Sequence, residues 1–333
     1  IGDKTDVSAF VRVNHNLVGD FLRLQAEAQV RSVLYTADGV DADLQNVLIN
    51  DDRLFFNPKI GVDYIVSSSS RGYASVAIAN REPARSDYLD RPSWGAESIS
   101  HERLIDFEVG YRYVAKRWAA EIGLYHMDYK DQLIATGMLN DVGSSVRVNV
   151  PSSFRQGVEF QAGMELHSRV RWDGNVTVSR NKINLFSETL YDYDDNFEYV
   201  NLVNHANTDI SFSPSFIAAS VFGYEVWSND DVKIVFELST KYVGKQFLDN
   251  TSNDNRSLPG YILNDCVLSV SNSFKRGGDL KLSIFANNIL DHMYSANGWT
   301  YSYLYGGMNA MTTENYVYPQ AGRHGFVNLT LTL

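Results

Sequence analysis

Aromatic and arginine side chains gather in two stretches of the sequence. One stretch follows Gly298 and the other begins at Arg81. Flat rings and guanidinium groups suit the binding of a planar or anionic ligand at the mouth of a cavity. We therefore predict that the ligand-binding residues are Arg81, Arg85, Trp94, Trp299, Tyr301, Tyr303 and Tyr305. The alternative is that the tyrosines pack the surrounding segments against one another.

Charged side chains recur at alternate positions in many segments. Leu22 and Leu24, for example, alternate with Arg23, and Glu27 and Arg31 continue the charged side. A period of two is that of a β-strand with one apolar and one polar face. We predict that the polar faces line a wet or protein-filled interior, and that the lining residues include Arg23, Glu27, Arg31, Glu108, Arg112, Glu159, Lys233 and Glu237.

Motifs for catalysis and metal binding are lacking in this sequence. It has no nucleophile elbow, zinc-binding helix motif or phosphate-binding glycine loop, so we predict that the protein is not an enzyme. Acidic groups near Asp38 and Asp192 do not match the spacing of an EF-hand, and we expect them to be solvated. Cys266 is the only cysteine, and the net charge of -11 argues against a nucleic-acid partner. We expect no metal and no cofactor.

Strand-like runs fill the chain, and helical periodicity is almost absent. About thirteen strands are predicted, beginning near Thr5, Phe21, Leu54, Gly72, Arg103, Trp118, Phe154, Val170, Ile210, Val232, Tyr261, Leu280 and Arg323. Short turns alternate with long polar loops, which are predicted at Thr36–Arg53, Glu82–Glu102, Gln132–Ser153, Asn184–Asp209, Leu248–Gly260 and Asp291–Gln320. This layout is typical of an all-β, antiparallel transmembrane β-barrel of the outer-membrane type.

A second set of aromatic residues marks the short turns. Its members are Tyr64, Tyr111, Tyr113, Trp118, Trp172, Tyr224, Trp227 and Phe274. Rings gathered at one end of many strands form the interfacial girdle of a membrane barrel. A soluble β-sandwich, which is the alternative all-β fold, would place more of its aromatic residues in mid-strand. The aromatic pattern therefore favours a membrane protein.

The odd strand number predicts that residues 1–333 are the C-terminal portion of a larger barrel. A complete single-chain barrel of this type has an even number of strands. The last run alternates Val327, Leu329 and Leu331 with polar residues and enters from a long loop. Counting back from it places Ile1 on the long-loop side, where an intact barrel would not begin.

Several stretches resemble TonB-dependent outer-membrane receptors, especially those of Bacteroidetes. The resemblance covers essentially the whole chain and is carried by Phe56–Val66, Tyr73–Tyr88, Leu124–Val148, Asn287–Tyr303 and Tyr318–Leu333. The segment NNILD at Asn287–Asp291 and the strand that ends the chain are fairly specific together. One departure is Leu333, because members of this family usually end on Phe.

The resemblance implies a 22-stranded barrel, of which this chain holds about the last thirteen strands, closed by an N-terminal plug domain. It also implies active uptake of a scarce nutrient across the bacterial outer membrane, energised by the TonB complex through the missing N-terminal part. The cargo favoured is an iron chelate (siderophore or haem), with cobalamin or a glycan as alternatives. A passive porin-like channel is the alternative of a different class. The implied partners are outer-membrane lipid, the TonB complex and a small-molecule chelate, and the sequence leaves open whether a surface lipoprotein caps the mouth.

Overall fold

Strands make up most of the chain, and helix is confined to short segments. The computed structural model describes residues 2–40, 46–89, 99–139, 145–193, 199–274, 277–306 and 310–332. The helical elements in these ranges are α1 (Arg85–Leu89) and the 3-10 helix η1 (Asp254–Arg256). Neither of these described helices is long and apolar enough to cross a membrane.

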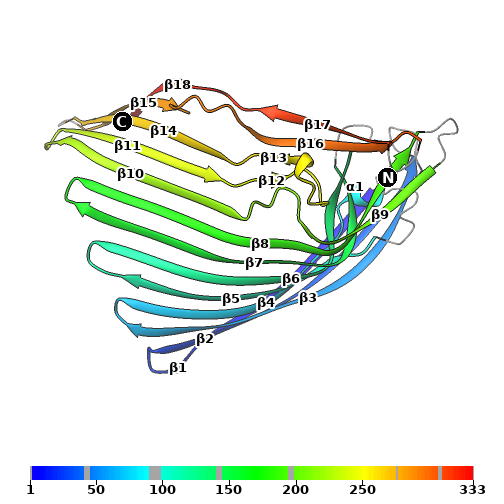
Figure 1. Cartoon of the computed structure of the whole chain (residues 1–333). Coiled ribbons are helices and arrows are strands. Elements are labelled where there is room, and N and C mark those ends of the chain that lie inside the picture. Colours follow the sequence, from blue (N-terminus) through cyan, green and yellow to red (C-terminus); the bar gives the residue numbers. More distant parts are fainter. Residues whose placement is uncertain are drawn as a thin grey trace.

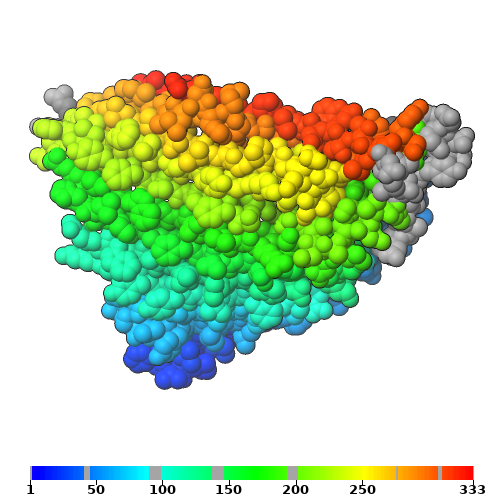
Figure 2. Space-filling model, in the orientation of Figure 1, coloured from blue at the N-terminus to red at the C-terminus, as the bar shows by residue number. Residues whose placement is uncertain are grey.

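A continuous antiparallel path of thirteen strands runs through the described part of the chain. The strands are β1 (Gly2–Val18), β2 (Leu22–Val40), β3 (Asn46–Ser67), β4 (Ser70–Arg81), β5 (Glu102–Val114), β6 (Trp118–Leu139), β7 (Ser145–His167), β8 (Val170–Asp192), β10 (Phe216–Ser228), β11 (Val232–Val243), β14 (Tyr261–Ser273), β15 (Asp279–Asn287) and β18 (His324–Thr332). The sheet curls into an open trough (Figure 1), and its strands form successive bands in sequence order (Figure 2). The predicted antiparallel, all-β fold is confirmed. The strand predicted to begin near Ile210 begins at Phe216 instead, just after Pro214, which cannot donate a backbone hydrogen bond to a ladder.

The predicted long loops are the main error in the sequence reading, because most of them contain strands. β2, β3, β6, β7 and β8 extend well into these segments, and β9 (Tyr199–Asp209) adds to β8. β16 (Ser295–Leu304) pairs with β17 (Met311–Pro319), and the short β12 (Gln246–Phe247) pairs with β13 (Ser257–Leu258). The polarity of these segments suggested loops, yet antiparallel strands that extend beyond a bilayer can carry polar side chains.

Short turns gather at one end of the trough, which is the left end in Figure 1. Side-chain oxygens complete some of them: the backbone N–H of Ser69 donates to Ser67 Oγ at 3.1 Å, and that of Val232 donates to Asn229 Oδ1 at 2.7 Å. Between β14 and β15, Gly277 has a φ of 95°, which glycine adopts without strain. The opposite end, where the chain extends furthest, is called the long-loop end below.

Cross-strand register gives the sheet two chemically different faces. Val62 on β3 pairs with Leu24 on β2 and with Ala74 on β4, so these side chains share one side. We define the apolar face by outward residues such as Leu24, Val62, Ala74, Val109, Leu124, Val158 and Val178, and the polar face as the opposite, inner side of the trough. Val109 is 53% exposed and Leu124 is 52% exposed. Apolar side chains so exposed over a whole sheet match the lipid-facing band of a membrane barrel.

The aromatic residues predicted to form a girdle lie at the short-turn end of the strands. Tyr113 stacks on Trp118 across the β5–β6 turn, with ring centroids 4.9 Å apart. Tyr64, Trp118 and Trp227 are each close to half exposed or more. Amphipathic rings at this position suit the boundary between hydrocarbon and water.

Buried apolar residues concentrate at the long-loop end. One cluster joins Ile134, Val150, Ile183, Phe186 and Ile210. A second cluster joins residues Ala37, Val47 and Ile49 of the β2–β3 extension to partly buried side chains of α1. This end of the sheet therefore has a packed core of its own, whereas the rest of the sheet is a single layer.

Candidate functional site

The residues predicted to line an interior all lie on the polar face. The register pairs that place them are Arg23 with Asp63, Glu27 with Lys59, Arg31 with Phe55, Glu108 with Tyr125, Arg112 with Glu121, Glu159 with Thr177, Lys233 with Ser271 and Glu237 with Val267. Opposite charges meet across neighbouring strands: Arg12 Nε lies 2.7 Å from Glu27 Oε2, and Lys233 Nζ lies 3.2 Å from Glu225 Oε2. Exposed ion pairs of this kind stabilise a fold by only about 0–1 kcal/mol each. Their main effect here is a strongly hydrogen-bonding inner surface.

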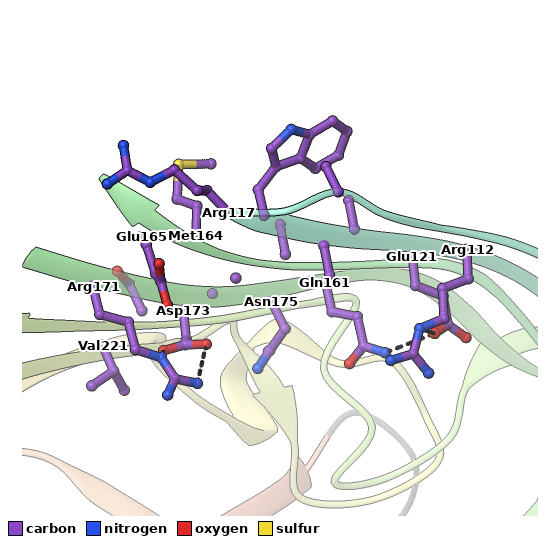
Figure 3. A pocket seen from close by; sticks show the side chains of 18 of the residues that line it. Arg112, Arg117, Glu121, Gln161, Met164, Glu165, Arg171, Asp173, Asn175 and Val221 are labelled. Atoms are coloured by element: carbon purple, nitrogen blue, oxygen red, sulfur yellow. Dashed lines mark hydrogen bonds and ion pairs between the residues drawn. The ribbon is translucent and has the colours of Figure 1, made fainter. Parts of the chain in front are cut away.

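A broad hollow of about 610 Å³ lies on the polar face near the short turns. In Figure 3, Arg112, Glu121, Gln161 and Asn175 project from one side of the ribbon, whereas Met164 projects from the other. The hollow therefore presents amide groups and charges of both signs.

Neighbouring side chains in this hollow are held by hydrogen bonds. Arg171 Nε donates to Asp173 Oδ2 at 2.6 Å, and Gln161 Nε2 donates to Glu121 Oε2 at 3.3 Å (Figure 3). Arg171 nevertheless remains 72% exposed. A wall of this kind can bind water or a polar protein surface.

A second hollow of about 400 Å³ follows along the same face. Tyr73 and Tyr125 line it, and each ring lies flat against a glycine of the neighbouring strand. A Cβ on Gly110 would come within 2.4 Å of the Tyr73 ring, and one on Gly157 would come within 2.7 Å of Tyr125 Oη. The glycines therefore allow these large side chains to cover the sheet.

Arg31 is the centre of an ion cluster near the long-loop end. Its Nη2 lies 2.6 Å from Asp6 Oδ2 and 2.8 Å from Glu82 Oε1, and Lys4 Nζ also contacts Glu82 Oε1 at 3.0 Å. Burial raises the pKa of Glu82, but the hydrogen bonds from Arg31 and Lys4 outweigh burial and lower this pKa to about 2. The cluster ties β1 and β2 to the segment that follows β4.

Arg256 forms a buried ion network that sequence reasoning missed. The side chain is 2% exposed; its Nη1 donates to Asp249 Oδ2 at 2.9 Å and also to Glu188 Oε1. His205 Nε2 contacts the other oxygen of Glu188 at 2.8 Å. Burial alone would lower the pKa of Arg256, but the attraction of Glu188 and Asp249 raises it. Because 68 positions separate Arg256 from Glu188, no local pattern signals this contact.

Tyrosines from two distant segments meet at the long-loop end. Tyr301 Oη lies 2.5 Å from Tyr193 Oη, and the ring of Tyr303 packs edge-on against Tyr193 with centroids 5.7 Å apart. Tyr301 and Tyr303 also stack on each other at 5.6 Å. Burial, and then the hydrogen bond with Tyr193, raises the pKa of Tyr301, so this hydroxyl stays protonated at physiological pH.

The remaining predicted aromatic residues extend this cluster along β16. Trp299 stacks on Tyr316 with ring centroids 4.4 Å apart and an interplanar angle of 11°. Tyr305 is 64% exposed. Trp299, Tyr301 and Tyr303 alternate along β16 and so share one of its faces. The rings pack against one another, as the alternative reading expected, and they also form a continuous aromatic surface.

The predicted arginines lie apart from the tyrosines. Arg81 Nε contacts Glu102 Oε2 at 3.1 Å at the end of the β4–β5 ladder, and Arg85 is exposed at the start of α1. Trp94 lies outside the described residues. Among the contacts of the described residues, the predicted ligand-binding set is thus divided between two places rather than joined in one.

Helix α1 is fixed to the polar face by buried polar contacts. Asp87 is 2% exposed and accepts hydrogen bonds from Arg147 on β7 at 2.7 and 2.9 Å. Tyr88 Oη donates to Asp51 Oδ2 on β3 at 2.7 Å. Burial and this hydrogen bond raise the pKa of Tyr88. The helix therefore links β3 to β7, which are separated by β4, β5 and β6 in the sheet.

The acidic groups considered in the sequence are only partly described. Asp41, Asp43, Asp194, Asp195 and Glu198 lie outside the described residues. Within the described ranges, no group of three or more His, Cys, Asp or Glu side chains is arranged to hold a metal ion.

An exposed apolar face, an aromatic row at the short-turn end and a charged inner face together define an outer-membrane β-barrel protein. The comparison with known families agrees. Residues 2–289 match the family described as "TonB dependent receptor-like, beta-barrel", and the chain belongs to this family of outer-membrane proteins. No curated protein sequence matches the chain.

Solved structures match the chain over nearly its whole length. The ferric yersiniabactin uptake receptor FyuA from Yersinia pestis is 16% identical, with a TM-score of 0.68 over 98% of this chain and 45% of that chain. The siderophore receptor PiuA from Acinetobacter baumannii is 13% identical, with a TM-score of 0.71 over 99% and 43%. The copper transporter OprC is 17% identical, with a TM-score of 0.69 over 98% and 47%. These likenesses show the fold, and the chain spans less than half of the length of each structure.

Proposed function

We propose that this chain is the C-terminal part of the barrel of a TonB-dependent receptor that takes up a scarce nutrient across the outer membrane. The family match over residues 2–289 carries this proposal. The two faces of the sheet support it, because lipid can cover the apolar side while the polar side remains available for a plug and a passing ligand.

An iron chelate is the proposed cargo. The solved structures with similar folds include a ferric yersiniabactin uptake receptor and a siderophore receptor, although a copper transporter is also among them. The surface formed by Trp299, Tyr301 and Tyr303 offers flat rings at the long-loop end. Arg85, which is exposed at the start of α1, supplies positive charge at a separate place, in keeping with an anionic chelate, whereas Arg81 is already paired with Glu102.

The charged polar face is proposed to contact a plug domain. Mixed charges such as Arg112 and Glu121 can exchange hydrogen bonds with a folded protein surface as readily as with water. Ligand binding can release such a plug only if it favours one plug state over another. Energy would then come from the TonB complex, and a surface lipoprotein is a further proposed partner at the mouth.

Growth on single nutrient sources tests the proposal. A strain that lacks the gene is expected to lose growth on a particular iron chelate and to regain it with the wild-type gene. Removal of TonB should abolish the regained growth. Growth that survives without TonB would indicate a passive channel, and dependence on copper or cobalamin alone would overturn the iron assignment.

Point variants test whether the aromatic surface on β16 binds the chelate that supports growth. The double substitution Tyr301→Ala and Tyr303→Ala is expected to weaken chelate binding by at least about 10-fold, because aromatic anchors often dominate a binding surface. Tyr64→Ala, which removes a tyrosine from the short-turn end, is the matched control. Equal binding by both variants, at equal protein abundance, would assign these mouth tyrosines to packing alone.

A further inference from the structure

The β16–β17 hairpin, which runs along the edge of the trough at the long-loop end (Figure 1), has two different faces. One face is buried on the segment around η1, where Thr300 is 4% exposed. Asn315, the cross-strand partner of Thr300, donates from Nδ2 to the backbone oxygen of Asn255 at 2.7 Å. Side chains alternate along a strand, so the opposite face carries Trp299, Tyr301 and Tyr303.

Cross-strand register adds one carboxylate to this aromatic face. Tyr316 is the partner of Trp299, and Glu314 is the partner of Tyr301. Partners of this kind share a face, with Cβ atoms about 5 Å apart. Glu314 is the only charged residue in β16 and β17. Its carboxylate therefore sets the charge of the aromatic face.

The carboxylate of Glu314 can accept further hydrogen bonds. Tyr316 Oη donates to its Oε2 at 2.5 Å. Within the described part of the chain, no basic side chain forms an ion pair with Glu314 within 4.0 Å. Glu188, in contrast, is bonded to both Arg256 and His205. Because an ionised carboxylate has about four lone-pair sites, Glu314 remains available to donors of a ligand.

The two segments that bring the tyrosines together are acidic. Residues 183–209 and 293–322 contain no Lys or Arg, and their acidic residues are Glu188, Asp192, Asp194, Asp195, Glu198, Asp209 and Glu314. The cations that reach these segments are already paired, because Lys182 contacts Asp209 at 2.8 Å and Arg256 is buried against Glu188 and Asp249. A surface with one sign of charge concentrates ligands of the opposite sign.

The hydroxyl protons of this aromatic face are used within the protein. Tyr316 donates to Glu314, and the hydroxyls of Tyr301 and Tyr193 bond to each other. The Trp299 ring stacks on the Tyr316 ring with centroids 4.4 Å apart. Faces of aromatic rings attract cations within about 6 Å, and Trp is the strongest of them. The surface therefore offers ring faces and a carboxylate, which suit a cation better than an anion.

We propose that Glu314, Trp299 and Tyr316 form a binding site for an organic cation, namely an ammonium or guanidinium group of the ligand. A guanidinium can lie on a ring face and donate to a carboxylate at the same time. The site rests on the proposed function in that it assigns this surface to the ligand. Because Arg85 is exposed at a separate place, a cargo that fits both carries a cationic group apart from its anionic groups.

Two probes of the same shape and different charge test this site in the full-length protein in lipid nanodiscs. Benzylguanidinium is positively charged, and benzylurea is its uncharged analogue. Binding is measured by ligand-detected NMR, with empty nanodiscs as the blank. The guanidinium is expected to bind roughly 10-fold more tightly than the urea, and added salt should reduce this preference.

Substitutions assign the preference to named side chains. Glu314→Gln removes the charge but keeps an acceptor for Tyr316, and it should weaken benzylguanidinium binding by roughly 5-fold while leaving benzylurea binding nearly unchanged. Trp299→Leu removes a ring face and should weaken the binding of both probes. Asp230→Asn removes an exposed carboxylate between β10 and β11 at the short-turn end. This matched control should bind both probes as the wild type does.

Three results would overturn the cation site: no binding of either probe, equal affinities of the wild type for both probes, or equal loss of benzylguanidinium binding in Glu314→Gln and Asp230→Asn. The growth assay separates this outcome from failure of the proposed function. Chelate-dependent growth without a probe preference would retain the receptor and reject the cation site, and the reverse result would retain the site and reject the iron chelate. If Glu314→Gln fails to fold, the comparison of the two probes on the wild type still decides.

Discussion

The two ends of the polar face are held together in different ways. Near the short turns, ion pairs such as Arg171–Asp173 are exposed on a single layer of sheet. At the long-loop end, Arg256 and Asp249 are almost completely buried, and apolar clusters surround the strand extensions. An ion pair between arginine and aspartate is therefore exposed at the short-turn end and buried in a packed interior at the long-loop end.

This difference shows where each end obtains its stability. The long-loop end carries buried charges that depend on one another, since an unpaired buried charge is costly. The short-turn end has little internal packing. Its stability depends on the backbone hydrogen bonds between strands, on lipid across its apolar face and on the water or protein surface that contacts its inner hollow. Substitutions at the two ends should therefore have very unequal effects.

The largest effect is expected from Arg256→Met. This substitution keeps most of the side-chain volume but leaves Glu188 and Asp249 without their cation, which should cost roughly 3–5 kcal/mol. Denaturant titration in lipid vesicles would measure the loss, and hydrogen exchange at the amides of Leu248 and Arg256 would locate it. A loss below about 1 kcal/mol would mean that these carboxylates readily regain water and that the long-loop end is not a closed interior.

The second-largest loss of stability is expected from a charge on the apolar face of the single-layer part of the sheet. Leu24→Arg places a charge on the apolar face and should cost roughly 2–4 kcal/mol near the bilayer midplane. Arg23→Leu, one position away on the polar face, should cost much less. The measurement is the free energy of folding into vesicles, and equal costs would contradict the assignment of the two faces.

A smaller effect is expected from Tyr301→Phe, which removes the hydroxyl bonded to Tyr193. The lost hydrogen bond should cost about 0.5–1.5 kcal/mol. Because the pKa of Tyr301 is raised in the folded protein, the unfolded chain loses this proton first as the pH rises above about 10. Stability should therefore fall above that pH, and the variant should fall less steeply. If the free energy of unfolding changes with pH in the same way for both proteins, the Tyr301 hydroxyl is exposed to solvent in the folded protein.

The smallest effect is expected from Arg171→Gln in the hollow near the short turns. The Arg171–Asp173 pair is exposed, so water replaces the lost contact and the free energy of unfolding should not change measurably. Vesicle-folding titrations at low and high salt provide the measurement. A large loss would show that the two ends of the polar face are held in the same way after all.

The sequence predicted the main path of the sheet because lipid contact imposes a strict period of two. Leu24, Val109 and Val158 could be assigned to one face, and Arg23 and Glu159 to the other, from alternation alone. The extensions of β2, β3, β6 and β7 were mistaken for loops because outside the bilayer no such constraint fixes their polarity. The division between Arg81 and the β16 tyrosines was also unpredictable, since it depends on which distant strands meet.

The sequence by itself determined the membrane-facing surface, the short-turn ends of most strands and the charged residues along the inner wall. These features follow from local alternation and turn chemistry, which each segment carries independently. Only the tertiary structure decided that Arg256 meets Glu188, that Tyr301 meets Tyr193 and that Glu314 stands beside Tyr301. Such contacts depend on strand register and on the folding of distant segments over one another, and no short stretch of sequence contains that information.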